Sequence, residues 1–320
     1  MPRSAAMNHE VKRAFGGLLP LIDTPELRDV LIQVRDGRAQ LWADFGSGLR
    51  QYQGWATDAA TVHRLAVQLI AAGGRHVDEL HPCADVRLGE GIRVHAMLPP
   101  ACVTGAAISI RVPRPIAPSF ESMVNAGLCA AQTAELLHTA VIERNNIIIS
   151  GSTGSGKTTL LASLLDLAGQ NERIVTIEDV SELRLTHQHW VALEARQANT
   201  EGVGELTLDR LLREALRMRP DRIALGECRG AEVLTLLSAL NTGHNGGAGT
   251  LHASTVHDVP ARLEALAALG GLHPGGLARQ AQSALHLVVH VSRAADGTHR
   301  IEALGQFHVR HETLEVKELT

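Results

Sequence analysis

The spacing of glycine, lysine and threonine in one stretch of the chain is that of a phosphate-binding loop. The stretch reads Gly151, Ser152, Thr153, Gly154, Ser155, Gly156, Lys157 and Thr158, with Thr159 next. It matches the pattern G-x-x-x-x-G-K-[ST] at every defined position. An apolar run at 147–149 precedes it and a helix-forming run at 160–165 follows it, which is the strand, loop and helix order that such a loop requires.

Each residue type in this loop has a physical reason to be there. Glycines let the backbone curl until successive N–H groups point at phosphate oxygens, and the N-terminus of the following helix adds positive potential. Lys157 can reach the β- and γ-phosphates, and the Thr158 hydroxyl can ligate magnesium. A glycine-rich turn that matches by chance is the alternative, and the flanking strand and helix argue against it. The sequence therefore predicts a site for a nucleoside triphosphate.

Carboxylates follow two further apolar segments that we expect to be strands. Glu227 ends the run 223–226, whereas Glu178 and Glu182 follow the strand expected at 173–177. Hydrolysis needs an acidic group that holds magnesium, in part through water, or polarises the attacking water. Strand C-termini are where α/β sheets gather such groups. Glu227 is thus the first candidate, with Glu178 and Glu182 beside it. A solvated carboxylate or a charged helix start is the alternative for each.

Two histidines, His244 and His252, lie in and just after a glycine-rich segment. We expect His252 at the end of a strand, where it could hydrogen-bond the γ-phosphate. The chain has 17 histidines, so position alone is weak evidence, and an ordinary polar side chain is the alternative.

Composition narrows the class of protein. Charged residues make up 20% of the chain and the formal net charge is −4, while only 2% of residues are aromatic. These values argue against a nucleic-acid partner bound on stacked aromatic platforms. The four cysteines lie far apart, so neither a zinc site nor a disulfide framework is expected. The N-terminus has no apolar signal core, and no apolar run approaches the ~18 residues of a membrane span. A cytoplasmic protein is expected.

Changes of pattern along the chain predict four segments. Residues 1–17 are polar and are expected to form a flexible arm, and 18–112 mix strand and helix patterns, as in a small α+β domain. Residues 113–118 contain three prolines and are expected to form a linker. From 119 to 320 helical and strand patterns alternate, which predicts a largely parallel sheet covered by helices, an α/β fold.

Four ordered motifs resemble those of the type II/type IV secretion-system (GspE-like) ATPase superfamily. In that family the phosphate loop, the acidic segment 176–182, the Gly226–Arg229 segment and the His244–His252 segment are called Walker A, Asp box, Walker B and His box. Segments at 176–183, 193–196, 219–223 and 243–246 look most like the CpaF/TadA branch, which powers tight-adherence (Flp) pili. The resemblance covers residues 18–291.

The resemblance implies a RecA-like domain that hydrolyses ATP with magnesium, in a homo-hexameric ring. It implies a motor for pilus assembly or protein secretion that works through an inner-membrane platform protein, at the inner face of the cell membrane. It also implies arginines that stabilise transition-state charge. The candidates are Arg87, Arg93 and Arg111 in the first domain, with Arg196 and Arg229 in the second. A plain surface role is the alternative for each of them.

Other functions that a phosphate loop could serve remain open at this stage. A nucleic-acid translocase or helicase with a RecA-like core is one, and a type IV secretion traffic ATPase is another. A nucleotide-binding regulator without hydrolysis is a third, but it would not need Lys157, Thr158, Glu227 and His252 together.

Overall fold

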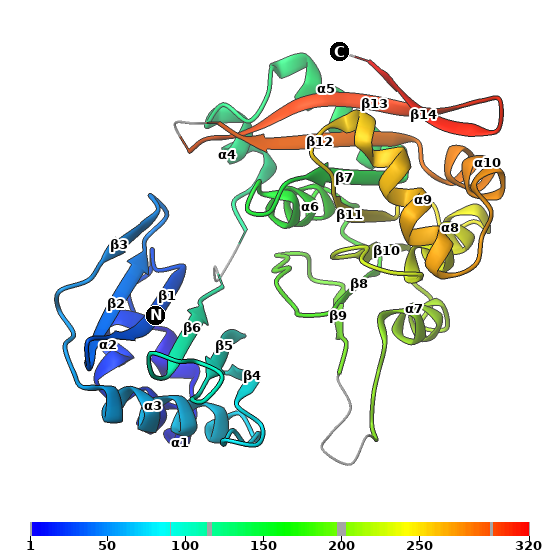
Figure 1. Ribbon diagram of the computed structural model, residues 1–320. Helices are drawn as coiled ribbons and strands as arrows, with labels where there is room; N and C mark the ends of the chain where they lie inside the picture. The colour runs from blue at the N-terminus through cyan, green and yellow to red at the C-terminus, as the bar shows by residue number, and fades with distance from the viewer. Residues whose placement is uncertain (1, 90, 114–116, 197–202, 295–296, 320) are drawn as a thin grey trace. The chain divides into compact units, whose positions relative to one another are not determined.

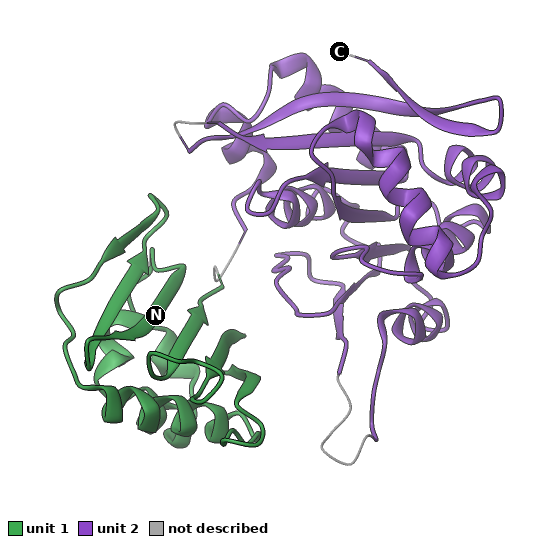
Figure 2. Cartoon of the chain, viewed as in Figure 1, with its two compact units in different colours: residues 1–114 green, residues 115–320 purple. Residues whose placement is uncertain are grey.

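The computed structural model describes residues 2–89, 91–113, 117–196, 203–294 and 297–319. The chain divides into two compact units, Met1–Arg114 and Pro115–Thr320 (Figure 2). The linker expected at 113–118 spans this division, and its residues 114–116 lie outside the described part of the chain.

Unit 1 is built on a six-stranded antiparallel sheet in the order β3-β2-β1-β6-β5-β4. Its strands are β1 (Asp29–Arg35), β2 (Arg38–Asp44), β3 (Leu49–Gln51), β4 (Cys83–Leu88), β5 (Ile92–Met97) and β6 (Ala107–Arg111). Buried residues alternate along β5 and β6, as expected for strands with one covered face. Helix α3 (Ala59–Ala72) covers that face, and its N-terminus is capped by Asp58.

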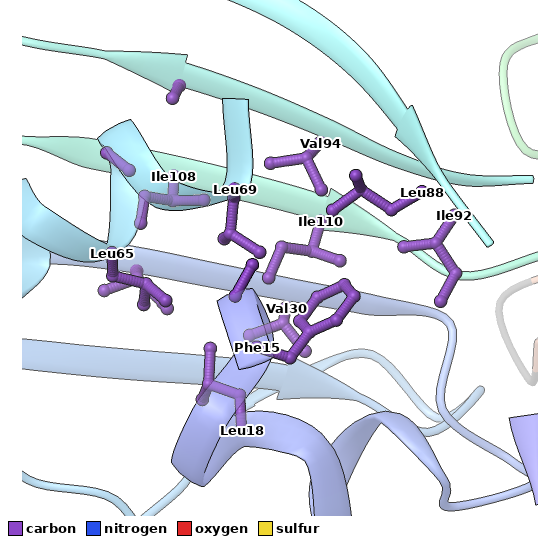
Figure 3. Packing of buried hydrophobic residues seen from close by; sticks show 14 of the residues in the cluster. Phe15, Leu18, Val30, Leu65, Leu69, Leu88, Ile92, Val94, Ile108 and Ile110 are labelled. Atoms are coloured by element: carbon purple, nitrogen blue, oxygen red, sulfur yellow. The ribbon is translucent and has the colours of Figure 1, made fainter. Parts of the chain in front are cut away.

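The prediction of a flexible arm at residues 1–17 is wrong, because the described residues of this segment are folded into the core of unit 1. They form η1 (Arg3–Ala6), α1 (His9–Phe15) and the start of η2 (Gly16–Leu18), and α2 (Leu19–Ile22) follows. Phe15 and Leu18 are each 1% exposed and point among the apolar side chains of the sheet (Figure 3). The polar composition concealed a short helix in which Val11, Ala14 and Phe15 are buried while Glu10 and Arg13 are exposed.

Unit 2 contains an eight-stranded sheet in the order β14-β13-β12-β7-β11-β10-β8-β9 (Figure 1). The six strands from β12 to β9 in this order run parallel, and β13 and β14 extend the sheet antiparallel beside β12. The parallel strands are β7 (Ile147–Gly151), β8 (Ile174–Glu178), β9 (Trp190–Glu194), β10 (Arg222–Leu225), β11 (Ala248–His252) and β12 (Leu287–Arg293). The antiparallel strands are β13 (His299–Arg310) and β14 (Thr313–Glu318). This is the mostly parallel α/β fold that the alternating pattern predicted.

Helices pack on both faces of the sheet, and the sheet separates two apolar cores. One core holds side chains from α7 (Leu208–Leu216), α8 (Glu232–Asn241), α9 (Val259–Leu269) and α10 (Pro274–Ala284). The other holds side chains from α4 (Phe120–Asn125), α5 (Ala131–Ile142) and α6 (Lys157–Leu165). The short η3 (Val256–Asp258) leads into α9. Burial on both faces explains the almost unbroken apolar runs of β7, β8 and β10.

Asn146 connects three segments at the start of the central strands. Its Oδ1 accepts hydrogen bonds from the N–H groups of Gly246 (2.8 Å) and Gly247 (3.0 Å). Its Nδ2 donates to the carbonyl of Ala284 at 2.6 Å, and the residue is fully buried. The start of β11 is therefore anchored beside β7, which places the far ends of these two strands next to each other.

None of the described helices combines the length and the apolar character that crossing a bilayer requires.

Candidate nucleotide site

The phosphate loop connects β7 to α6 at the carboxyl edge of the parallel strands. Gly151, Gly154 and Gly156 have φ angles of +152°, +74° and +96°, which side chains with a Cβ rarely adopt. A Cβ at Gly151 would lie 2.2 Å from the Val291 carbonyl oxygen and 2.5 Å from Ser155 Oγ. Gly154 and Gly156 allow the loop to turn, and the absence of a side chain at Gly151 allows β12 to pack closely against the start of the loop.

Lys157 is the first residue of α6 and is only 6% exposed. Its Nζ donates hydrogen bonds to the carbonyl oxygens of Gly151 (2.9 Å) and Ser152 (2.8 Å), which lie on its own loop. Burial lowers the pKa of Lys157, against the opposing attraction of Glu227. The ammonium is thus held inside the curl of the loop, where a phosphate oxygen can replace the carbonyls.

His252 ends β11 and lies between Lys157 and Glu227. Its Nδ1 is 3.3 Å from Lys157 Nζ, and its Nε2 is 2.8 Å from Glu227 Oε1. Since the ammonium can only donate, Nδ1 accepts and the ring proton sits on Nε2, which donates to the carboxylate. Burial and the positive charge of Lys157 lower the pKa of His252, which favours this neutral form.

Glu227 follows β10 and is held from two sides. Arg229 Nη2 donates to Glu227 Oε2 at 2.8 Å, while Arg229 Nη1 lies 3.5 Å from Asp179 Oδ2. Burial opposes the charged form of Glu227, but the bond from Arg229 and the nearby positive charges outweigh it and lower its pKa. The same bond raises the pKa of Arg229. The geometry therefore offers an ionised carboxylate with a fixed direction.

The backbone before Glu227 is fixed by close packing. Thr250 Oγ1 donates to the Gly226 carbonyl at 2.6 Å, and the Gly226 N–H donates to the Ile177 carbonyl at 2.8 Å. A Cβ at Gly226 would lie 2.4 Å from Glu178 Cγ, so glycine is needed for β8 and β10 to end side by side.

Glu178 ends β8 but supports the acidic segment rather than facing open solvent. It is 3% exposed, and its Oε1 accepts hydrogen bonds from the N–H groups of Glu182 (3.0 Å) and Leu183 (3.1 Å). Burial raises the pKa of Glu178 to about 7 in spite of these bonds. Glu182 is half-buried.

The other predicted loop residues lie at the tip of the loop and in the first turn of α6. Ser152, Thr153 and Gly154 are exposed at the tip of the loop. Thr158 and Thr159 are half-buried in the first turn of α6, whose N–H groups lack helical partners. A hydroxyl at the start of this helix and the carboxylate of Glu227 are oxygen donors of the kind that magnesium prefers. The residues thus fit both the triphosphate and the metal.

The predicted arginines are in different places. Arg229 lies at the site, as described above. Arg196 Nε donates to the Gly204 carbonyl at 2.7 Å, and its backbone pairs with Leu206. Arg87, Arg93 and Arg111 are in unit 1, where Arg93 is directly opposite both of the others on β4, β5 and β6.

Two contacts near the motifs did not follow from the sequence. His244 Nδ1 lies 3.2 Å from the Ala239 carbonyl at the end of α8, a local contact. His299, the first residue of β13, has its Nδ1 2.8 Å from the carbonyl oxygen of Ser155. No motif marks His299, because its place beside the phosphate loop depends on how β12 and β13 pair.

The chain matches the family model described as "Type II/IV secretion system protein" over residues 57–313. It is 45% identical over 292 residues to a putative conjugal transfer protein of Mycobacterium tuberculosis, covering 89% of this chain and 82% of that protein. It is 34% identical over 271 residues to a type IV secretion system protein PtlH homolog of Bordetella bronchiseptica, covering 77% and 78%.

Solved structures of low sequence identity share the fold. The ATPase DotB of Yersinia pseudotuberculosis matches with a TM-score of 0.61 at 18% identity, over 95% of this chain and 80% of that one. The ATPase DotB of Legionella pneumophila matches with a TM-score of 0.58 at 20% identity, over 88% and 77%. The predicted RecA-like fold is confirmed.

The buried carboxyl of Glu178 has a consequence for stability. Because the folded state raises its pKa to about 7, this group favours folding at low pH. That contribution is lost as the pH rises from the unfolded value of ~4.3 through the folded value. Glu178→Gln keeps an acceptor for the two N–H groups but cannot ionise. As the pH rises from 5 to 8, we expect its free energy of unfolding to increase by up to ~3 kcal/mol relative to that of the wild type. Urea unfolding at both pH values measures the change. Glu214→Gln, on the exposed side of α7, is the control, and a pH-independent difference for Glu178→Gln would contradict the assignment.

Proposed function

The chain belongs to the type II/IV secretion system protein family, and on that premise we propose how its residues drive a motor. It is an ATP-hydrolysing enzyme with a RecA-like unit, and its relatives include proteins named for conjugal transfer and for type IV secretion. The single observation that carries the proposed mechanism is the series of contacts from Lys157 through His252 to Glu227 at the phosphate loop.

Lys157 and the loop N–H groups bind the triphosphate in this proposal. To reach a phosphate, the Lys157 ammonium exchanges the carbonyls of Gly151 and Ser152 for phosphate oxygens. Magnesium, held by the Thr158 hydroxyl and in part through water by Glu227, would supply charge neutralisation at the β- and γ-phosphates. Ser152 to Thr159 line the same cradle.

Glu227 orients or deprotonates the attacking water, with its carboxylate directed by His252 and Arg229. Its lowered pKa keeps it ionised at neutral pH, which a base requires. His252 reports the γ-phosphate, because Lys157 withdraws its donor from Nδ1 when it turns to the phosphate. Glu182 and Asp179 assist by charge, whereas Glu178 supports their loop.

The finer function is a motor for pilus assembly or protein secretion. We propose that the chain forms a homo-hexamer and works on an inner-membrane platform protein, at the inner face of the membrane. Within the family, we propose the tight-adherence branch on the motif segments named above. Arg87, Arg93 and Arg111, which form a row on the sheet of unit 1, are the proposed source of further positive charge at the γ-phosphate.

Substitutions at the two ends of the contact series separate binding from hydrolysis. We expect Lys157→Ala to abolish ATP turnover. Among the described loop residues Lys157 alone carries a buried ammonium, so the variant has no such charge to bind the phosphates. We expect Glu227→Gln to keep magnesium–ATP binding and lose at least ~100-fold in turnover, since the general base is removed. Phosphate release assays and equilibrium binding measure both, with Glu214→Gln as the control. Turnover like that of wild type in Glu227→Gln would move the role of base to Glu182.

A conjugation function is the second candidate, because a relative with 45% identity bears the name conjugal transfer protein. A chain that acts on a membrane platform should respond to its protein partner or to anionic lipid vesicles, and not to DNA. We expect ATP turnover by the purified chain to be unchanged by single- or double-stranded DNA at low salt, where any electrostatic contact would be strongest. A turnover rate that rises with DNA concentration would instead favour a nucleic-acid translocase, and with it a direct role on DNA in conjugation.

A further inference from the structure

We propose that His299 is a positioning residue for the phosphate cradle, and that it aims the backbone N–H of Gly156 at the bound phosphates. The inference rests on the proposed function, since it concerns how the same loop binds its nucleotide. It assigns a role to a residue outside the four motifs, on a strand beyond the parallel part of the sheet.

The contact between His299 and the loop has a defined donor and acceptor. His299 Nδ1 lies 2.8 Å from the carbonyl oxygen of Ser155. A carbonyl oxygen can only accept, so Nδ1 carries the proton and donates it. The ring also lies against Gly156, where a Cβ would be 3.1 Å from Nδ1. The imidazole therefore holds one peptide group of the loop by a hydrogen bond and by packing.

That peptide group joins Ser155 to Gly156, and its planarity transmits the contact. In a trans peptide the carbonyl of one residue and the N–H of the next point in opposite directions. When His299 holds the Ser155 carbonyl, the Gly156 N–H must point away from His299. Gly156 is also the N-cap of α6, and its own carbonyl accepts the first helical bond, from the Leu160 N–H at 2.9 Å. The Gly156 N–H thus joins the N–H groups of the first helical turn, which form the phosphate cradle.

The sheet gives His299 a firm base. It begins β13 and pairs directly with Arg293, the last residue of β12. The Ala294 N–H donates to the Thr298 carbonyl at 2.8 Å, so a further backbone hydrogen bond follows the Arg293–His299 pair. Strand β12 in turn pairs with β7, and the Val291 carbonyl lies against Gly151 at the start of the loop. Both ends of the phosphate loop therefore rest on the β12–β13 pair.

Replacement of His299 by three residues tests this role in the full chain. An Asn amide nitrogen takes the position of Nδ1, a Gln amide nitrogen lies one bond farther along, and Ala removes the donor. We expect His299→Ala and His299→Gln to weaken magnesium–ADP binding and to raise the KM for ATP by about three- to tenfold, the effect of one lost hydrogen bond. The kcat should change little, and His299→Asn should restore both values toward wild type. His308→Ala, on an exposed part of the same strand, is the control.

The outcomes separate this inference from the proposed function. Equal affinities for ADP in the Asn and Gln variants, or wild-type affinity in a folded Ala variant, would overturn the role of His299. Because Asn and Gln are both polar and similar in size, their comparison decides the question even where Ala does not fold. ADP binding without any ATP turnover in wild type would contradict the proposed motor and leave the His299 comparison valid. No ADP binding by wild type would overturn both.

Discussion

The burial of the Lys157 ammonium is the constraint on which the rest of the site depends. A charged group removed from water costs several kcal/mol unless other groups compensate it. Here two loop carbonyls and the field of Glu227 do so, while burial still lowers its pKa. The first N–H groups of α6, which have no helical partners, begin at this same residue. A site that gathers this much positive potential is completed by a polyanion, and a triphosphate meets both the lysine and the amides.

The parallel sheet brings the acidic and histidine residues to that ammonium. Strands β7, β11, β10 and β8 are neighbours, and each ends at the same edge of the sheet. Lys157, His252, Glu227 and Glu178 follow or end these four strands in turn, although they span about a hundred residues of sequence. Small residues, Gly226 above all, let the strand ends approach closely enough for direct hydrogen bonds. Fold and site are therefore one arrangement.

Much of this could be predicted from local pattern, and the failures have physical reasons. The phosphate loop, the parallel sheet and the acidic strand ends follow from short, strict spacing. The polar composition of residues 1–17 predicts a flexible arm, whereas the spacing of Val11, Ala14 and Phe15 lets a short helix bury one side. The anchoring role of Glu178 and the contact of His299 depend on pairing between strands distant in sequence, which no local pattern records. The roles of the unit 1 arginines stay a prediction.

The most direct test of the account is a calorimetric titration of magnesium–ATP into the purified chain. One saturable site per chain is expected, weakened when magnesium is chelated, because the metal adds positive charge beside the phosphates. A chain that gives no binding heat with millimolar magnesium–ATP, at more than one temperature, would contradict the account at its base.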